Sequence, residues 1–118
     1  MPRLVLILVL FASGCDSGRS PAPVLGGNPD NGRLLLRQFG CGACHAIPGV
    51  AAADGRMGPP LAAVARRAYL AGVLPNTPEN MVDFIRAPSA ADPLTAMPDL
   101  GVTQAHARDM VAYLYTLR

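Results

Sequence analysis

The stretch Cys41-Gly42-Ala43-Cys44-His45 decides how the rest of this 118-residue chain is organised. Two cysteines separated by two residues on a short helical turn present both thiols at one place, and the next residue adds an imidazole. This pattern is typical of covalent haem attachment, in which each thiol adds to a vinyl group and the imidazole ligates the iron. We therefore predict one covalent haem c, with its iron, bound by Cys41, Cys44 and His45.

Two other chemistries use closely spaced cysteines. A thioredoxin-like dithiol follows a strand in a βαβ unit, and no alternating β-type pattern precedes Cys41. A structural zinc site needs four ligands, and the only other cysteine and histidine are Cys15 and His106. The pattern favours haem attachment, with a redox dithiol or half of a zinc site as the alternatives.

Residues 1–14 have the three parts of a secretory signal peptide: the basic Arg3, an apolar run over 4–11 and a small-residue exit at 12–14. The apolar run is too short to span a bilayer as a mature helix. Cleavage would fall before Cys15, either by an ordinary signal peptidase or at a bacterial lipobox.

The lipobox interpretation rests on Ala12-Ser13-Gly14-Cys15, which has alanine where leucine is usual. We favour a lipidated Cys15, because a free thiol in an oxidising compartment could trap a cysteine of the haem motif as a disulfide. A plain secreted protein is the alternative. Residues 15–27 are then a lipidated N-terminus and a flexible linker rich in Ser, Gly and Pro. This predicts attachment to the periplasmic side of a bacterial membrane, with residues 28–118 as one haem domain.

Helix caps and apolar spacing predict a small all-α domain of three to five helices, with long loops and no strand. The predicted helices start at an Asn, Thr or Pro signal and the first three stop at Gly or Pro. They cover 29–38, 61–71, 78–86 and 104–117. Residues 46–58 and 87–101 are expected to be loops. So small a domain buries little apolar area by itself, so that the apoprotein is expected to be largely unfolded.

The second axial ligand is sought among Met57, Met81, Met97, Met110 and His106. Met81 and Met110 fall in apolar helical stripes and are interpreted as core residues. His106 lies among polar neighbours and is expected to be an exposed surface histidine. Met97 lies on a loop between Pro93 and Pro98, where a rigid backbone can hold its thioether opposite His45. We predict Met97 as the ligand, with Met57 or an open iron position as the alternatives.

Three motifs together resemble a known family: CGACH at 41–45, Gly58-Pro59-x-Leu61, and Ala96-Met97-Pro98 before a helix ending Ala112-Tyr113-Leu114. They resemble class I monohaem cytochrome c over residues 28–117. The segment 66–80 is similar to the cytochrome-c domain fused to subunit II of some bacterial haem-copper oxidases. Two features depart from that subgroup. Phe84 stands where related domains often have tryptophan, and no copper-site signature is present, so that this chain is not itself a usual subunit II.

The resemblance implies roles for further residues. The backbone carbonyl of Pro59 would accept a hydrogen bond from Nδ1 of His45 and so orient the ring. Propionate contacts or bracing of a loop are implied for Arg66, Tyr69 and Asn76, although each fits an ordinary surface residue as well, and Arg66-Arg67 also fits a solvated pair. Gly32 and Tyr113 would lie near the crossing of the first and last helices.

Histidine–methionine ligation fills both axial positions of the iron, so the expected activity is one-electron transfer and not enzymatic catalysis. The expected donor is a membrane-bound cytochrome bc complex or dehydrogenase, and the expected acceptor is a terminal oxidase. The alternatives are a dedicated subunit of a periplasmic dehydrogenase, and a haem sensor or enzyme with an open iron site.

The charge of the chain does not indicate a nucleic-acid partner. All ten basic residues are arginine and the formal net charge is only +2. The sequence has no basic stripe with interleaved aromatic residues of the kind that binds nucleic acid.

Overall fold

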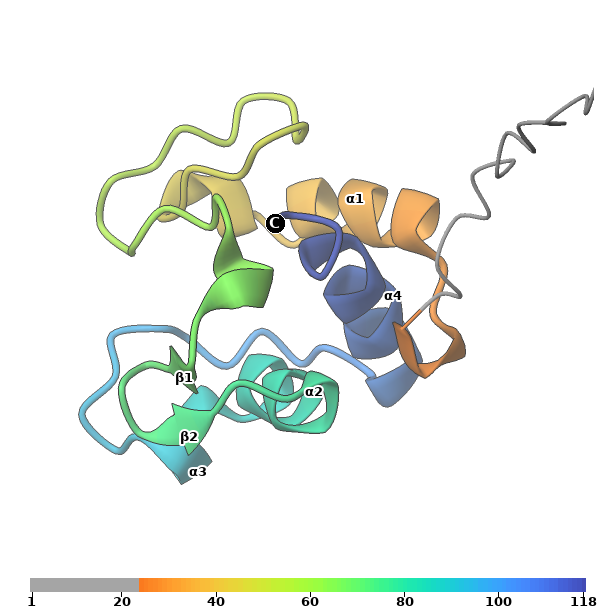
Figure 1. The fold of residues 1–118 in the computed structure, drawn as a ribbon. Coiled ribbons are helices and arrows are strands. Elements are labelled where there is room, and N and C mark those ends of the chain that lie inside the picture. The colour runs from red at the N-terminus through yellow and green to blue at the C-terminus, as the bar shows by residue number, and fades with distance from the viewer. Residues whose placement is uncertain (1–23) are drawn as a thin grey trace, which may run out of the picture.

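The computed structural model describes residues 24–118, which form a small globule of helices joined by long loops (Figure 1). Its regular elements are α1 (Pro29–Gln38), β1 (Tyr69–Leu70), β2 (Leu74–Pro75), α2 (Pro78–Arg86), α3 (Pro88–Ala91) and α4 (Gln104–Leu114), with short 3-10 turns at Val24–Gly26, Cys41–Ala43 and Val64–Arg66. Four α-helices agree with the predicted three to five. The predicted signal peptide, Cys15 and the first part of the linker lie outside the described residues. Within 24–118, no helix has the length and apolar character needed to cross a membrane.

The three longer helices begin at the predicted capping residues. In each case a side-chain oxygen accepts hydrogen bonds from backbone N–H groups of the first turn, which have no partner inside the helix. The caps are Asn28 for α1, Thr77 for α2 and Thr103 for α4. The predicted starts are thus confirmed, as is the end of α1 at Gln38. The last helix ends at Leu114, three residues earlier than predicted, because the N–H of Thr116 and Leu117 bond three residues back and tighten the chain into a final turn.

Helices α1 and α4 cross in direct contact, and Gly32 makes the close approach possible (Figure 1). A Cβ atom on Gly32 would overlap the backbone carbonyl of Asp109 and lie 2.9 Å from the backbone nitrogen of Met110. The Asp109 carboxylate also accepts a hydrogen bond from the N–H of Asn28 at 2.7 Å and from Nδ2 of Asn31 at 2.6 Å. The predicted position of Gly32 at this crossing is confirmed.

The hydrophobic core lies between α1, α2 and α4, with contributions from the loops. Its members on the α-helices are Leu35, Leu36, Met81, Val82, Ile85, Ala107, Met110, Val111 and Leu114. Its other members are Val64 on a 3-10 turn, Leu70 on β1, and Ile47, Val50 and Val102 on loops. Met81 is 3% exposed and Met110 is fully buried, so their interpretation as core methionines is confirmed.

The predicted helix over 61–71 and the predicted absence of strands are both wrong. Ala63 has a left-handed φ of 54°, and Ala71 and Gly72 form a turn with φ of 48° and 73°. Two successive left-handed residues suit a tight antiparallel hairpin and cannot continue a right-handed helix. The chain therefore makes one 3-10 turn and then pairs β1 with β2, Tyr69 opposite Pro75 and Leu70 opposite Leu74.

Two further segments are more ordered than the sequence predicted. The expected loop over 87–101 contains α3, a single helical turn that starts at Pro88, where the missing N–H costs nothing. The end of the expected linker also belongs to the domain. Val24 packs against the core, and Gly27 lies so close to the backbone carbonyl of Arg108 that a Cβ would overlap it.

Candidate functional site

The CGACH motif forms a compact turn directly after α1. Gly40 ends the helix with a φ of 73°, and the carbonyl of Cys41 then accepts hydrogen bonds from the N–H of Cys44 at 3.3 Å and of His45 at 3.0 Å. Both bonds fold the backbone back onto one carbonyl. The two cysteines are free, partly buried thiols on the same turn as the histidine.

The environment of Cys41 does not suit a redox dithiol. Burial raises the pKa of the Cys41 thiol; a backbone hydrogen bond lowers it, and the neighbouring Cys44 raises it further. Thiol–disulfide exchange depends on a thiolate, and its reactive cysteines have lowered pKa values. The motif also follows a helix, α1, whereas the dithiol of a thioredoxin-like unit follows a strand. Both observations count against the thioredoxin-like alternative.

His45 is oriented by the residue that the resemblance implied. Its Nδ1 lies 2.7 Å from the backbone carbonyl of Pro59, so the expected hydrogen bond is present. A carbonyl only accepts, so Nδ1 carries the proton, and in the neutral imidazole Nε2 is left with its lone pair. This arrangement fixes the ring and leaves Nε2 available as a metal ligand.

Two backbone hydrogen bonds join the loop over 46–60 to the motif. The N–H of Gly55 bonds to the carbonyl of Gly42 at 3.0 Å, and the N–H of Gly58 to the carbonyl of Cys44 at 2.8 Å. Ile47 and Val50 are buried in the core. The small residues of this loop therefore serve close backbone packing against the motif, which a merely flexible loop would not show.

Gly58 lies against the imidazole, and we predict that Gly58→Ala displaces the His45 ring. A Cβ on Gly58 would lie 2.7 Å from Nδ1 and 2.9 Å from Nε2 of His45. Since this φ is not left-handed, the effect is steric alone, and overpacking of this kind costs about 1–3 kcal/mol. Urea unfolding measures the loss of stability, and Met57→Ala, at an adjacent side chain that is 87% exposed, is the matched control. An unchanged unfolding midpoint in the Gly58→Ala variant would contradict the proposed packing.

The loop that carries Met97 is held by three hydrogen bonds of one kind. In each, a side-chain oxygen accepts from the backbone N–H two residues later, which rigidifies a turn. The pairs are Asp92 with Leu94 at 3.0 Å, Thr95 with Met97 at 3.2 Å, and Asp99 with Gly101 at 2.9 Å. Met97 is partly buried and packs against the core, whereas Met57 projects into solvent. The structure thus favours Met97 over Met57 as a positioned thioether.

His106 differs from the predicted exposed surface histidine. It is partly buried, its ring packs edge-on against Phe39 with centroids 5.9 Å apart, and its buried Nδ1 has no hydrogen-bond partner. The cause is the position of His106 in the first turn of α4, on the side that meets the end of α1. Its polar sequence neighbours concealed this contact.

Of the residues implied to contact propionates or brace a loop, Asn76 braces a loop. Its Nδ2 donates to the carbonyls of Val64 at 2.9 Å and Arg67 at 2.8 Å, and its Oδ1 accepts from the Tyr115 hydroxyl at 2.9 Å. Burial, and secondarily the charge of Glu79, raises the pKa of Tyr115, so the hydroxyl keeps the proton that it donates.

Arg66 is exposed and Tyr69 is 60% exposed, so no protein contact reveals a role for either. The sequence analysis named Arg67 only as part of a solvated pair and Tyr113 only at the helix crossing, and it missed the contacts that both make. The Arg67 guanidinium donates to the carbonyl of Pro60, and the Tyr113 hydroxyl donates to the carbonyl of Pro48 at 2.7 Å. The bond from Tyr115 to Asn76 was missed as well.

We predict that Asn76→Ala lowers the free energy of unfolding by about 1–3 kcal/mol. The substitution leaves two carbonyls and a hydroxyl without partners in a partly buried setting, and unpaired buried polar groups cost about this much. Tyr115→Phe removes only one of the three bonds and should cost less, about 1 kcal/mol. Tyr69→Phe, at a mostly exposed side chain, is the control. Equal stability of the Asn76 and Tyr69 variants in urea unfolding would refute the bracing role.

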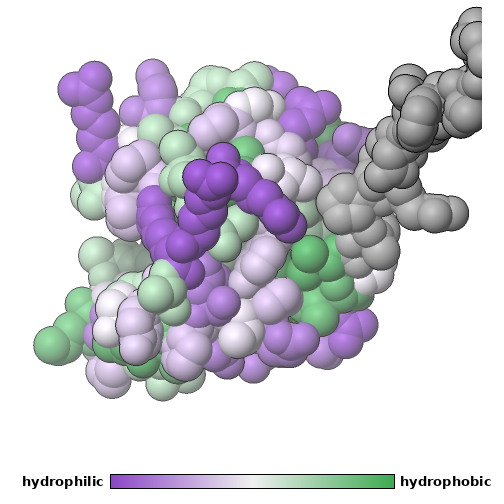
Figure 2. All heavy atoms as spheres, in the orientation of Figure 1, coloured by the Kyte–Doolittle hydropathy of each residue, from purple (hydrophilic) through white to green (hydrophobic). Residues whose placement is uncertain are grey.

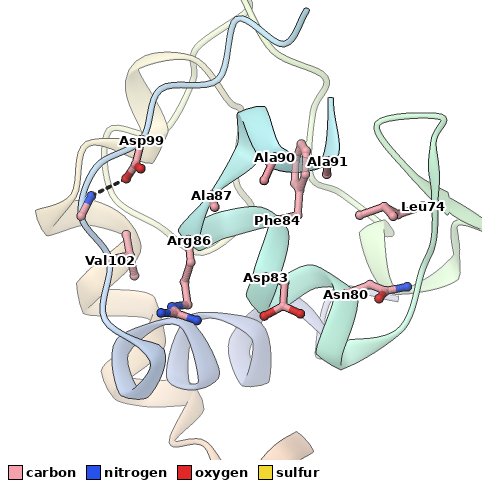
Figure 3. Close-up of a pocket in the computed structure, with 11 residues that line it drawn as sticks. Leu74, Asn80, Asp83, Phe84, Arg86, Ala87, Ala90, Ala91, Asp99 and Val102 are labelled. Atoms are coloured by element: carbon pink, nitrogen blue, oxygen red, sulfur yellow. Dashed lines mark hydrogen bonds between the residues drawn. The ribbon is translucent and has the colours of Figure 1, made fainter. Parts of the chain in front are cut away.

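A cavity of about 620 Å³ lies elsewhere in the fold, between α2, α3 and the segment that leads into α4 (Figure 3). Neither Met97 nor any residue of the motif lines it. Among residues 24–118, no three His, Cys, Asp or Glu side chains come together as a metal-binding group. The donor set present is different: two free thiols with two residues between them, one oriented imidazole and one partly buried thioether. These residues fit a covalent haem with histidine–methionine ligation.

Comparison with known proteins adds no family to these observations. No protein-family model matches the chain, and no match is found among curated proteins.

Proposed function

We propose that this protein is a class I c-type cytochrome, a one-electron carrier with a single haem bound through Cys41 and Cys44. The axial ligands would be Nε2 of His45 and the sulfur of Met97. The observation that carries the proposal is the hydrogen bond of 2.7 Å between His45 Nδ1 and the Pro59 carbonyl, next to a pair of free thiols on one turn. Held by these residues, the haem iron would supply a reversible one-electron change of valence.

The roles of the protein residues follow from their contacts. The Pro59 carbonyl holds the proton on His45 Nδ1 and so fixes the orientation of the ring. Gly58 gives the ring room, and the hydrogen bonds of the loop over 46–60 keep the motif in place. Asp92, Thr95 and Asp99 stiffen the loop that carries Met97. A rigid arrangement of both ligands limits rearrangement when the charge of the site changes, which favours fast electron transfer.

The cellular setting belongs to the same proposal and rests on the sequence alone. A diacylglyceryl group on Cys15 would anchor the domain on the periplasmic side of a bacterial membrane. Membrane-bound redox proteins would then be its partners: a cytochrome bc complex or dehydrogenase as donor, and a terminal oxidase as acceptor. Arg66 and Tyr69, whose side chains are exposed, remain propionate contacts implied by the resemblance alone.

The test is the intact mass and visible spectrum of the protein produced in a host that attaches haem covalently. We expect one haem per chain, which stays bound in acid and organic solvent. The intact mass of the native chain should also show cleavage before Cys15 and the added acyl chains. A variant with both Cys41→Ser and Cys44→Ser should release its haem in acidic acetone. A colourless, well-folded product from such a host would refute the proposal.

A further inference from the structure

Charge is unevenly distributed over the described residues. The segment 74–102, which contains α2, α3 and the Met97 loop, carries four carboxylates and one arginine, a formal charge of −3. The rest of 24–118 carries three carboxylates and seven arginines, a formal charge of +4. The four acidic residues of the segment are Glu79, Asp83, Asp92 and Asp99. A near-neutral domain is therefore strongly polarised, and its negative part lies in one continuous segment.

The same segment contains the open cavity of about 620 Å³. Figure 3 shows Phe84 and the α3 alanines in its middle, Leu74 on one side, and Asp99 and Val102 on the other. Apolar side chains and small alanines form much of its wall, Asn80 and the exposed Arg86 also line it, and Asp83 and Asp99 are exposed carboxylates at its rim. Two carboxylates against one guanidinium leave the lining with a formal charge of −1 beside its apolar part.

Exposed apolar residues on the adjoining loop extend this surface. Leu94 is 94% exposed and Leu100 is 42% exposed, although the hydrogen bonds of Asp92 and Asp99 hold the backbone in place. Figure 2 shows apolar residues projecting at the lower left, where Figure 1 places both the turn between β1 and β2 and the loop between α3 and α4. An apolar side chain presented on a rigid loop costs little entropy when it is buried by a partner.

We propose that this acidic face, residues 74–102, is the docking surface for a partner protein whose contact region places an apolar side chain among lysines or arginines. The apolar side chain would enter the cavity beside Phe84, and the basic groups would pair with Asp83 and Asp99. Charge complementarity selects the partner. The acidic face repels a partner with an acidic surface and steers a partner with a basic surface toward itself. The proposal names the partner chemistry of the proposed electron carrier and rests on that function.

The test uses short peptides as probes of the complementary chemistry, added to the ¹⁵N-labelled, haem-loaded protein at low ionic strength. The probe is acetyl-Lys-Lys-Leu-Lys-Lys-amide. One control peptide replaces its leucine with serine, and the other replaces its lysines with glutamates. We expect amide shift changes confined to residues 74–102, weaker binding of the serine peptide, no binding of the glutamate peptide, and loss of binding in high salt.

Two matched variants separate this face from the rest of the surface. Asp83→Asn with Asp99→Asn removes two charges, and an amide oxygen at 99 can still accept the N–H of Gly101. Removal of each charge should weaken the binding of the lysine–leucine peptide by about two- to fivefold, which is the range measured for exposed ion pairs. Asp54→Asn, at an exposed carboxylate outside this segment, should leave binding unchanged.

Several outcomes would overturn the docking proposal. The first is that the lysine–leucine peptide causes no shift changes at millimolar concentration, and the second is that the shift changes spread over the whole surface. The third is that Asp54→Asn weakens peptide binding as much as the double variant does. Concentration-dependent self-association abolished by the double variant would instead assign the acidic face to the basic side of a second copy. The visible spectrum of the same sample separates the two proposals: a missing peptide response with haem bound refutes only the docking, and a missing haem refutes the cytochrome.

Discussion

Gly32→Val should destabilise the domain by about 3 kcal/mol or more, a large part of the stability of a protein this small. Any Cβ at residue 32 would overlap the backbone carbonyl of Asp109, and backbone cannot rotate away as a side chain can. Relief of the overlap requires α1 and α4 to separate. That separation would break the hydrogen bonds from Asn28 and Asn31 to the Asp109 carboxylate and loosen the core around Met110.

The alanine variant makes this prediction sharper, because two effects have opposite signs. Helix propensity alone favours alanine over glycine by about 1 kcal/mol inside a helix, so that Gly32→Ala would stabilise an isolated α1. The overlap with Asp109 predicts a clear loss instead. Urea unfolding followed by circular dichroism measures both variants, and Leu34→Val, at an exposed position of the same helix, controls for a β-branched residue. A stabilised Gly32→Ala variant would show that the two helices do not cross as closely as described.

Much of the fold could be predicted because its signals are local. Asn28, Thr77 and Thr103 cap helices through their own side chains, and the sequence around each is sufficient to locate it. The burial of Met81 and Met110 follows from helical spacing in the same way. The starts of the three longer helices are therefore encoded in short stretches of sequence, whereas the position of Gly32 at the crossing was implied by the resemblance.

The errors arose where distant contacts decide the backbone. Ala63 and Ala71 adopt left-handed conformations that alanine does not prefer, and the amide of Asn76 compensates by bonding two carbonyls of the segment that a helix would have used. Alanine-rich sequence predicts helix on propensity alone, so only the tertiary contact could reveal the hairpin. His106 is a similar case, since its burial depends on Phe39 at the end of a helix far away in sequence.

The residues of the candidate site also fall into those that the sequence reveals and those that only the folded structure reveals. The motif at 41–45 could be found because the chemistry fixes residue types at short spacing. The role of Pro59 was implied by the resemblance alone, and its hydrogen bond with His45 is present. The bracing contacts of Arg67, Tyr113 and Tyr115 to backbone carbonyls and to Asn76 could not be found. A backbone carbonyl has no sequence signature, so a partner that recognises one is visible only once the loops are folded.

In the proposed cytochrome, Met97→Ala should lower the reduction potential by roughly 0.2–0.4 V, within the range of about 0.8 V that axial ligands span. A thioether stabilises ferrous iron better than the water that would replace it, so its loss favours the ferric state. The absorption band of the sulfur–iron bond in the red part of the spectrum should disappear. The fold should survive, because Met97 is only partly buried at the edge of the core and the turn through Thr95 depends on its backbone N–H alone.

Met57→Ala is the matched control for the Met97 experiment, because it removes the same side chain from a loop position that is 87% exposed. Potentiometric titration and the ferric spectrum of both variants distinguish three arrangements. Loss of the band with Met97→Ala alone assigns the ligand to Met97, and loss with Met57→Ala alone moves it to the loop over 46–60. If the wild-type protein lacks the band and both variants have the same potential as the wild type, the iron has an open position. Such a protein would bind carbon monoxide readily in its reduced form and would act as a sensor or enzyme, since a vacant coordination site permits ligand chemistry that a filled one prevents.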